Sequence, residues 1–210
     1  FLTNETVFEV EKLPEHLIVV GGGPIGIELG FAFCRLGSRV TIVEAVTPLA
    51  NDDPELTRIV LERVQSQGVR ILADTRVEKV AFAKKQFTVT VSKGSVTDTI
   101  EGSHLLVATG RAATVNGLGL EKAKVAYDKR GITVSTRMKT TNGRIFAIGD
   151  VAGGLQFTHM ANYHASIVLR NILMRWPTRT REHIVPWVTF TDPELAWVGM
   201  NEAQAARLFQ

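Results

Sequence analysis

One stretch near the beginning of the chain constrains the fold more than any other. The sequence LIVVGGGPIG, from Leu17 to Gly26, joins an apolar strand to a glycine turn and the start of a helix. A second apolar run, Arg39 to Val43, follows the helix and ends in Glu44. A strand, a glycine turn, a helix and a second strand that ends in a carboxylate together predict a dinucleotide-binding unit.

The glycines of this turn have separate physical reasons. Gly21 allows the chain to turn sharply out of the strand, Gly23 allows the backbone to approach a pyrophosphate, and Gly26 allows the helix to lie close to the sheet. The pyrophosphate is expected at the free N–H groups and the positive dipole end of the helix. The residues predicted to contact the dinucleotide here are Gly21, Gly23, Pro24, Ile25 and Gly26. The alternative is that the glycines form only a tight turn.

Glu44 predicts which dinucleotide is bound. Its carboxylate can accept hydrogen bonds from the adenosine ribose hydroxyls, and it would repel the 2′-phosphate of NADP. No Arg or Lys occurs from Ala45 through Glu55 to receive such a phosphate. The sequence therefore favours NAD(H) over NADP(H). The alternative is that a carboxylate at the end of a strand is simply solvated.

Composition and charge exclude several other classes of protein. The 210 residues carry a net charge of only +3, and the basic residues are dispersed apart from Lys84-Lys85 and the stretch Arg175 to Arg181. We interpret these as a solvated face and a linker rather than a nucleic-acid surface. No segment has the length of a membrane span and no signal peptide is present, so a cytoplasmic location is expected. The single cysteine, Cys34, excludes an intrachain disulfide, and the histidines show no metal-ligand spacing.

The first half of the chain predicts a doubly wound α/β fold with an inserted antiparallel meander. Residues 51–53 are expected to cap a second helix that has Pro54 in its first turn and ends near Gly68. A third strand over 69–73 completes the alternation of strands and helices. Three short strands follow at 77–82, 87–91 and 96–100, and then a buried strand that begins at His104.

The second half of the chain is less regular. The expected elements are a short strand near 132–134, an apolar strand over 144–150, a helix from about His159 to Arg175, a strand at 186–190 and a turn at 191–194. A last helical pattern covers 201–209.

Four motifs, taken in order, resemble the flavoprotein disulfide reductases, the family of dihydrolipoamide dehydrogenase, glutathione reductase and mercuric reductase. They are GGGPIGIE at 21–28, ATGR at 108–111, IFAIGD at 145–150 and FTDPE at 190–194. The resemblance implies a linker from the FAD domain at 1–14 and a Rossmann-like NAD(H)-binding domain at 15–112. It also implies the central part of the FAD domain at 113–180 and the start of an α/β dimerisation domain at 181–210.

The resemblance assigns flavin-binding roles to the second half of the chain. It implies that Asp150 holds the ribityl chain of FAD, and that the backbone of Gln156, Phe157, Thr158 and His159 runs beside the flavin. Without the resemblance, Asp150 reads as a turn carboxylate at the end of a strand, and His159 as a residue at a helix N-terminus.

Three more residues receive nucleotide-binding roles from the resemblance. It implies that Glu28 lies near the nicotinamide and flavin rings, that Val77 touches the adenine, and that Gly110 approaches the nicotinamide end of the cofactor. Glu28 lies on an otherwise apolar helix and needs a partner or water, because burying a lone carboxylate is costly. Val77 can equally be only a core residue of the meander.

The sequence also departs from the family pattern. It contains neither a second, FAD-binding glycine motif nor the CxxxxC redox pair, nor a histidine followed five residues later by glutamate. We therefore expect a fragment that binds NADH, holds no catalytic residue and no metal, and is inactive alone. The stretches QFTH at 156–159 and PWVTFTDPE at 186–194 are most similar to mercuric-reductase-like members, although mercury reduction requires cysteines that this sequence does not have.

In the intact protein, the resemblance implies a homodimeric enzyme that passes a hydride from NAD(P)H to FAD and then electrons to a disulfide or metal acceptor. The sequence does not specify that acceptor. Two alternatives stay open: a stand-alone NAD-dependent dehydrogenase, and a non-enzymatic module that senses NADH. Neither nucleic acid nor a membrane is an expected partner.

Overall fold

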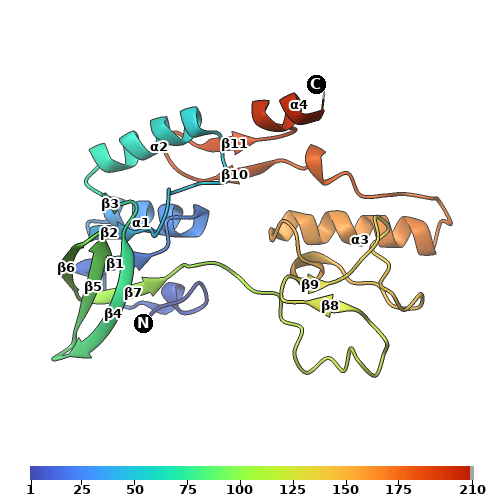
Figure 1. Ribbon diagram of the computed structural model, residues 1–210, viewed down its shortest axis with the longest axis horizontal. Helices are drawn as coiled ribbons and strands as arrows, with labels where there is room; N and C mark the ends of the chain where they lie inside the picture. The colour runs from blue at the N-terminus through green and yellow to red at the C-terminus, as the bar shows by residue number, and fades with distance from the viewer. Residues whose placement is uncertain (209–210) are drawn as a thin grey trace. The chain divides into compact units, whose positions relative to one another are not determined.

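The computed structural model describes residues 1–208, which form two compact units (Figure 1). The first unit contains everything up to Gly110, together with Trp187–Trp197 and the segment that begins at Asn201. The second unit contains Arg111–Pro186 and Val198–Met200. The assignment of these segments to NAD, FAD and dimerisation domains stays a prediction.

A four-stranded parallel sheet forms the centre of the first unit. Its strand order is β3-β2-β1-β7, with β3 at Arg70–Leu72, β2 at Arg39–Val43, β1 at His16–Val20 and β7 at His104–Val107. All three pairings are parallel. This confirms the predicted doubly wound α/β fold, in which crossover helices cover the sheet and bury its central strand.

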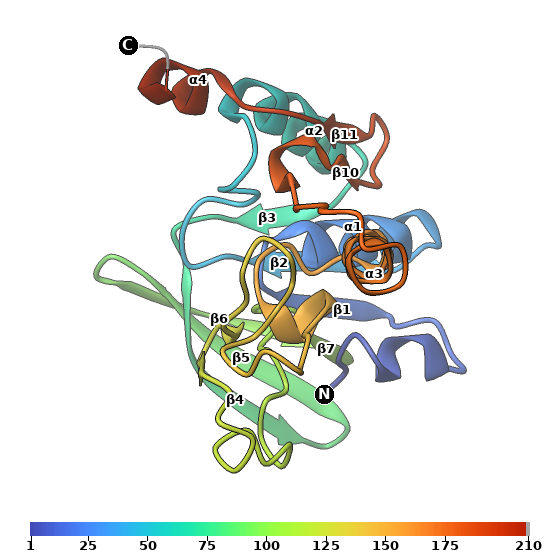
Figure 2. The ribbon, with the colours of Figure 1, turned by 90° about the vertical axis from the view of Figure 1, so that its right-hand side faces the viewer.

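Consecutive residues of β1 face two different hydrophobic clusters. Leu17 and Val19 pack with residues of helices α1 (Pro24–Arg35) and α2 (Pro54–Ser66). Ile18 packs with the meander instead. Since side chains alternate along a strand, β1 joins a helical layer to a β layer (Figure 2).

Local sequence explains where the two helices begin. The Asp53 carboxylate accepts hydrogen bonds from the N–H groups of Glu55 and Leu56, at 2.9 and 3.3 Å, and Pro54 occupies the first turn of α2. The predicted cap is therefore confirmed. Helix α1 begins with Pro24 after Gly23, and no side chain among the described residues caps it.

The predicted meander is confirmed as an antiparallel three-stranded sheet of β4 (Arg76–Ala83), β5 (Gln86–Lys93) and β6 (Val96–Gly102). Its inner face buries Val89 and Val91. The turn between β4 and β5 has two residues, Lys84 and Lys85.

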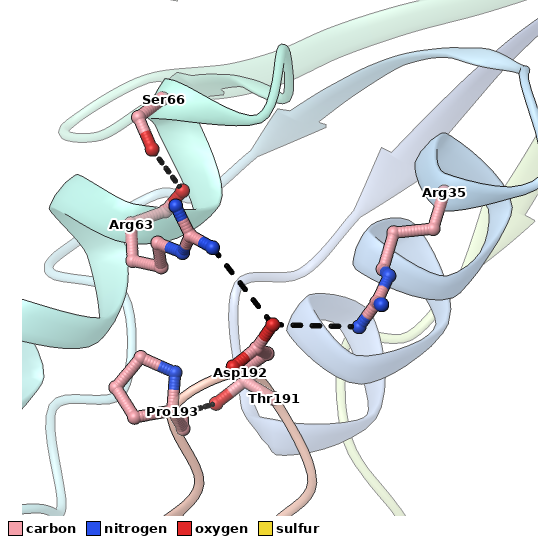
Figure 3. Close-up of polar contacts among 6 residues, drawn as sticks. All are labelled: Arg35, Arg63, Ser66, Thr191, Asp192 and Pro193. Carbon is pink, nitrogen blue, oxygen red and sulfur yellow. Dashed lines mark hydrogen bonds and ion pairs between the residues drawn. The ribbon is translucent and has the colours of Figure 1, made fainter.

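A hairpin far along the sequence completes the first unit. Strands β10 (Trp187–Thr189) and β11 (Leu195–Trp197) pair antiparallel beside α2 (Figure 1). Leu195 enters the same core as Leu17. At the turn, Asp192 lies between Arg35 of α1 and Arg63 of α2, with N···O distances of 3.7 and 3.9 Å (Figure 3).

The short elements of both units complete the inventory of the described residues. The first unit also contains a 3₁₀ helix η1 (Thr6–Glu9) and a helix α4 (Glu202–Leu208). The second unit contains two short strands, β8 (Tyr127–Asp128) and β9 (Gly131–Ile132). Its helices are α3 (Thr158–Ile172) and the 3₁₀ helices η2 (Gly149–Ala152) and η3 (Glu182–Ile184). The predicted end of the last helix, residue 209, lies outside the described residues. None of the helices within 1–208 is long and apolar enough to cross a membrane.

The predicted strand over 144–150 is wrong. This apolar run forms only an isolated bridge, between Phe146 and Lys139, and ends in η2. Its N–H groups bond to nearby loop carbonyls, those of Asn142 and Met138. An apolar run becomes a strand only where a neighbouring strand supplies a ladder of partners, and here irregular loops supply them.

Two other predictions for the second unit need shorter bounds. The strand near 132–134 is limited to β9, with Val134 in an isolated bridge. Helix α3 ends at Ile172 rather than Arg175, because Arg175 has a left-handed φ of 52° that a helix cannot continue. The Asn171 side chain donates to the carbonyl oxygen of Thr178 at 2.8 Å and fixes the chain after the helix.

Candidate functional site

The glycine turn lies where β1 meets α1, at the carboxyl edge of the parallel sheet. Gly21 has φ +111°, and a Cβ there would lie 2.3 Å from the carbonyl oxygen of Ala108. A Cβ on Gly26 would lie 1.9 Å from the carbonyl oxygen of Gly21. The two positions therefore accept only glycine, since any side chain would collide with backbone.

Gly23 is placed differently from its neighbours. A Cβ built on it would meet no atom within 4 Å, so packing alone does not require a glycine there. The first N–H groups of a helix have no intrahelical acceptor, and in the part of the chain described here no side chain caps α1. With Pro24 lacking an N–H group, Ile25 and Gly26 offer free donors beside this open space. The arrangement fits an anionic group at a helix N-terminus.

Glu44 is tied to the same turn. Its Oε2 accepts from the N–H of Gly22 at 2.6 Å, and its Oε1 accepts from the N–H of Val46 at 3.0 Å. The half-buried carboxylate is therefore held in position rather than simply solvated. Each carboxylate oxygen has a second lone pair, so both can still accept a hydroxyl hydrogen.

Val77 and Gly110 lie on segments that meet this edge. The N–H of Thr75 donates to the carbonyl oxygen of Glu44 at 2.9 Å and fixes the chain that enters β4. Val77 is partly buried against the meander core, the alternative role considered for it. Gly110 is exposed, with φ +129° and open space where a Cβ would lie.

Glu28 has a partner that the sequence did not reveal. Its Oε1 accepts from the backbone N–H of Phe190 at 2.8 Å, at the end of β10. Burial raises the pKa of Glu28, and the hydrogen bond from Phe190 offsets part of the increase. The helix that begins at the glycine turn is thus attached to the hairpin.

In the second unit, Arg111 brings two predicted segments together. Its Nη2 lies 2.5 Å from Oδ2 of Asp150, and its Nη1 donates to the carbonyl oxygen of Gln156 at 3.0 Å. Asp150 is therefore a positioned carboxylate rather than a free turn residue. Arg111 belongs to the ATGR motif but had no predicted role, because spacing cannot show that its partners lie about forty residues later.

The beginning of α3 carries the remaining predicted residues. The rings of Phe157 and His159 stack, with centroids 5.3 Å apart, while Thr158 and His159 are exposed. Further along α3, the buried Nδ1 of His164 accepts from the N–H of Gly149 at 3.2 Å and supports the turn that carries Asp150. His164 had no signal in the sequence beyond its place on the helix.

The predicted site residues thus form two groups, one in each unit. The first unit brings the glycine turn together with Glu44, and the second brings Asp150 together with Gln156. Cofactor contacts of both groups stay predictions.

Comparisons with known proteins point to one family. The model of the pyridine nucleotide-disulphide oxidoreductase family matches residues 1–165. A mercuric reductase from Streptomyces lividans is 36% identical over 206 residues, which cover 97% of this chain and 43% of that protein. A dihydrolipoyl dehydrogenase from Mycobacterium tuberculosis is also 36% identical, over 97% of this chain and 45% of its own length.

Solved structures give the same result. An HOCl-induced flavoprotein disulfide reductase from Escherichia coli superposes with a TM-score of 0.88 at 32% identity, over 98% of this chain and 47% of that one. LpdA from Mycobacterium tuberculosis gives a TM-score of 0.89 at 30% identity. The chain spans less than half the length of these relatives.

Proposed function

The chain belongs to the pyridine nucleotide-disulphide oxidoreductase family, and from this premise we propose that its first unit binds NAD(H). Members of this family depend in general on FAD and NAD(P).

One observation carries the proposal: the open space at Gly23 adjoins the uncapped N-terminus of α1. Gly21 and Gly26 are fixed by packing, whereas Gly23 is not, and a ligand in the open space would account for its lack of a side chain. A pyrophosphate there would accept from the N–H groups of Ile25 and Gly26 and meet the positive end of the helix dipole.

Glu44 would select the nucleotide. The N–H groups of Gly22 and Val46 already hold its carboxylate in one position. Binding a ribose would therefore cost little side-chain conformational entropy at Glu44. It would accept from the ribose hydroxyls of NAD(H) and repel the 2′-phosphate of NADP(H). Val77 would border the adenine, and Gly110 and Glu28 the nicotinamide end.

The second unit would supply part of an FAD site. Asp150 would accept hydrogen bonds from ribityl hydroxyls, and Arg111 would hold that carboxylate and the Gln156 carbonyl in register. The backbone from Gln156 through Phe157 and Thr158 to His159 would line the flavin. When bound, NAD(H) and FAD supply the hydride and electron-transfer chemistry, and the residues of this chain supply binding and orientation.

In the whole protein, a homodimer in this proposal, NAD(P)H and FAD would supply the hydride and electron chemistry directed to a disulfide or metal acceptor, and the residues named above would hold these two cofactors. The 210 residues alone would retain NADH binding without turnover, because no catalytic residue is assigned among them.

The test is a titration of the chain with NADH and NADPH, followed by NADH fluorescence, for the native sequence and Glu44→Gln. Glutamine keeps one acceptor oxygen for the glycine turn but removes the charge. We expect the native chain to prefer NADH, and Glu44→Gln to lose about tenfold of that preference. Glu62→Gln, on the exposed face of α2, is the matched control. An unchanged preference in Glu44→Gln would remove Glu44 from the site, and binding of neither nucleotide would contradict the proposal.

A further inference from the structure

A polar cavity of about 270 Å³ lies at the opposite edge of the parallel sheet, where β1 and β2 begin. It is lined by residues from the starts of these strands, the end of β6 and the turn between β4 and β5. The charged and titratable residues around it are Arg39, Lys84, Lys85, Glu15, Glu101 and His16. The glycine turn follows the other end of β1, so this cavity is separate from the proposed nucleotide site.

Three cations line this cavity, together with the carboxylates of Glu15 and Glu101. Within the chain as described, Arg39, Lys84 and Lys85 form no ion pair, although five other pairs are present. Like charges that share a partly enclosed space repel one another, and an anion placed among them removes that repulsion.

The backbone conformation of Lys84 and Lys85 is a second observation that favours an anion in this cavity. Ala83 pairs with Gln86, so these two residues form the whole turn, and both have left-handed φ values, 50° and 64°. Such two-residue turns favour Asn-Gly, because a Cβ is unfavourable at positive φ. The turn conformation does not favour two lysines, whereas an anionic ligand in the adjoining cavity would.

His16 forms a neutral part of the cavity wall. A carbonyl oxygen can only accept, so Nδ1 donates to the carbonyl of Glu101 at 2.6 Å, and Nε2 accepts from the hydroxyl of Thr41 at 2.9 Å. Burial and the charge of Arg39 lower the pKa of His16. The positive charge of the cavity therefore comes from the arginine and the two lysines.

The carboxylates of Glu15 and Glu101 limit which anions this cavity can accept. They would repel an anion that only accepts hydrogen bonds, such as sulfate. Hydrogen phosphate carries a P–OH group, and small phosphate monoesters carry hydroxyls, which a carboxylate can accept. A mixed lining of cations and carboxylates therefore suits a phosphate group better than sulfate.

We propose that this cavity binds a phosphate group, as the free ion or a small monoester, independently of the nucleotide site. Lys84 and Lys85 are its principal ligands, and Arg39 completes the cationic side. This proposal does not rest on the proposed NAD(H) function, because none of its residues belongs to the glycine turn.

The test uses the whole 210-residue chain and the variant K84N/K85G. Asn-Gly suits the turn, so the variant is expected to fold at least as well as the native chain. Inorganic phosphate, glycerol 3-phosphate and sulfate are titrated at neutral pH and constant ionic strength, with the His16 ring followed by NMR. We expect saturable binding of at least one phosphate, and a loss of about tenfold or more in affinity in K84N/K85G. The more tightly bound phosphate identifies the source.

The control variant K122N/K129N removes the same charge from exposed positions of the second unit and is expected to bind like the native chain. NADH binding, measured in parallel, should be the same in all three chains. Three outcomes overturn the proposal: no saturable phosphate binding, equal phosphate affinity in K84N/K85G, or sulfate binding as tightly as phosphate.

Discussion

The two units obtain their backbone hydrogen bonds in different ways. In the first, the ladders of the parallel sheet and the meander, together with helices α1 and α2, pair backbone groups with one another. In the second, polar side chains bond to the loops: Thr141 accepts from the N–H of Ala126 and donates to the carbonyl of Lys124, and Asn142 donates to the carbonyl of Ala123.

This difference explains where the sequence patterns are informative. Hydrophobic periodicity reports how regular backbone lies against a core, so it is reliable only where backbone pairs with backbone. Where a threonine or asparagine provides the partner, the signal is a single polar residue whose target is not visible in the sequence.

The largest expected effect would test how tightly the first unit is packed at its glycines. Gly26→Ala should cost about 3 kcal/mol or more of unfolding free energy, because the new methyl group would collide with the carbonyl of Gly21. Gly23→Ala, where the methyl group meets open space, should cost less than about 1 kcal/mol. Urea unfolding measures both. Equal losses would show that Gly23 is also constrained by packing.

A smaller effect would test the role of side chains in the second unit. The buried Thr140 hydroxyl donates to the carbonyl oxygen of Ile145 and accepts from the N–H of Asn142. Thr140→Val should therefore cost about 1–2 kcal/mol, measured by amide exchange across the second unit. Thr90→Val, on β5, is the control and should be nearly neutral. The contrast between the units fails if the two substitutions have the same effect.

The stability of the first unit should depend on pH through His16. The pKa of His16 is lowered in the folded chain, so below about pH 6.5 the unfolded chain binds the extra proton first. The stability contributed by neutral His16 is complete above that pH and is lost as pH falls through the window between the two pKa values. The slope is at most about 1.4 kcal/mol per pH unit for one proton. His16→Gln should flatten the slope relative to the native chain, and identical slopes in the two chains would exclude His16 as the cause.

The smallest effect is expected at the turn of the hairpin. Asp192 and both of its arginine partners are about half exposed, so Asp192→Asn should cost no more than about 1 kcal/mol, and less at high salt. The neighbouring Glu194→Gln serves as the control. A larger loss that high salt reduces would mean that this ion pair, and not the burial of Leu195, attaches the hairpin to the first unit.

Particular residues show which parts of the fold and of the candidate site could be predicted from the sequence. Asp53 and Pro54 predicted the start of α2 correctly, and the alternating apolar residues in 87–91 predicted β5. Both elements are determined by interactions between residues that are close in the sequence. The strand predicted over 144–150 was wrong, since an apolar pattern does not show whether a neighbouring strand is present to pair with it. Among the site residues, the glycine spacing indicated the turn, whereas the links from Arg111 to Asp150 and from Glu28 to Phe190 depend on tertiary folding and had no local signal.

The hairpin also has an optical consequence. The indole rings of Trp187 and Trp197 meet edge to face, with centroids 4.0 Å apart, and the chain has only one other tryptophan, Trp176, in the second unit. Two indoles at this separation share their excited states, so the pair should give a circular-dichroism couplet that disappears when the hairpin detaches. With Trp176→Phe, all tryptophan emission would come from the first unit, and bound NADH would absorb part of it. The chain would then carry its own spectroscopic probe of nucleotide binding.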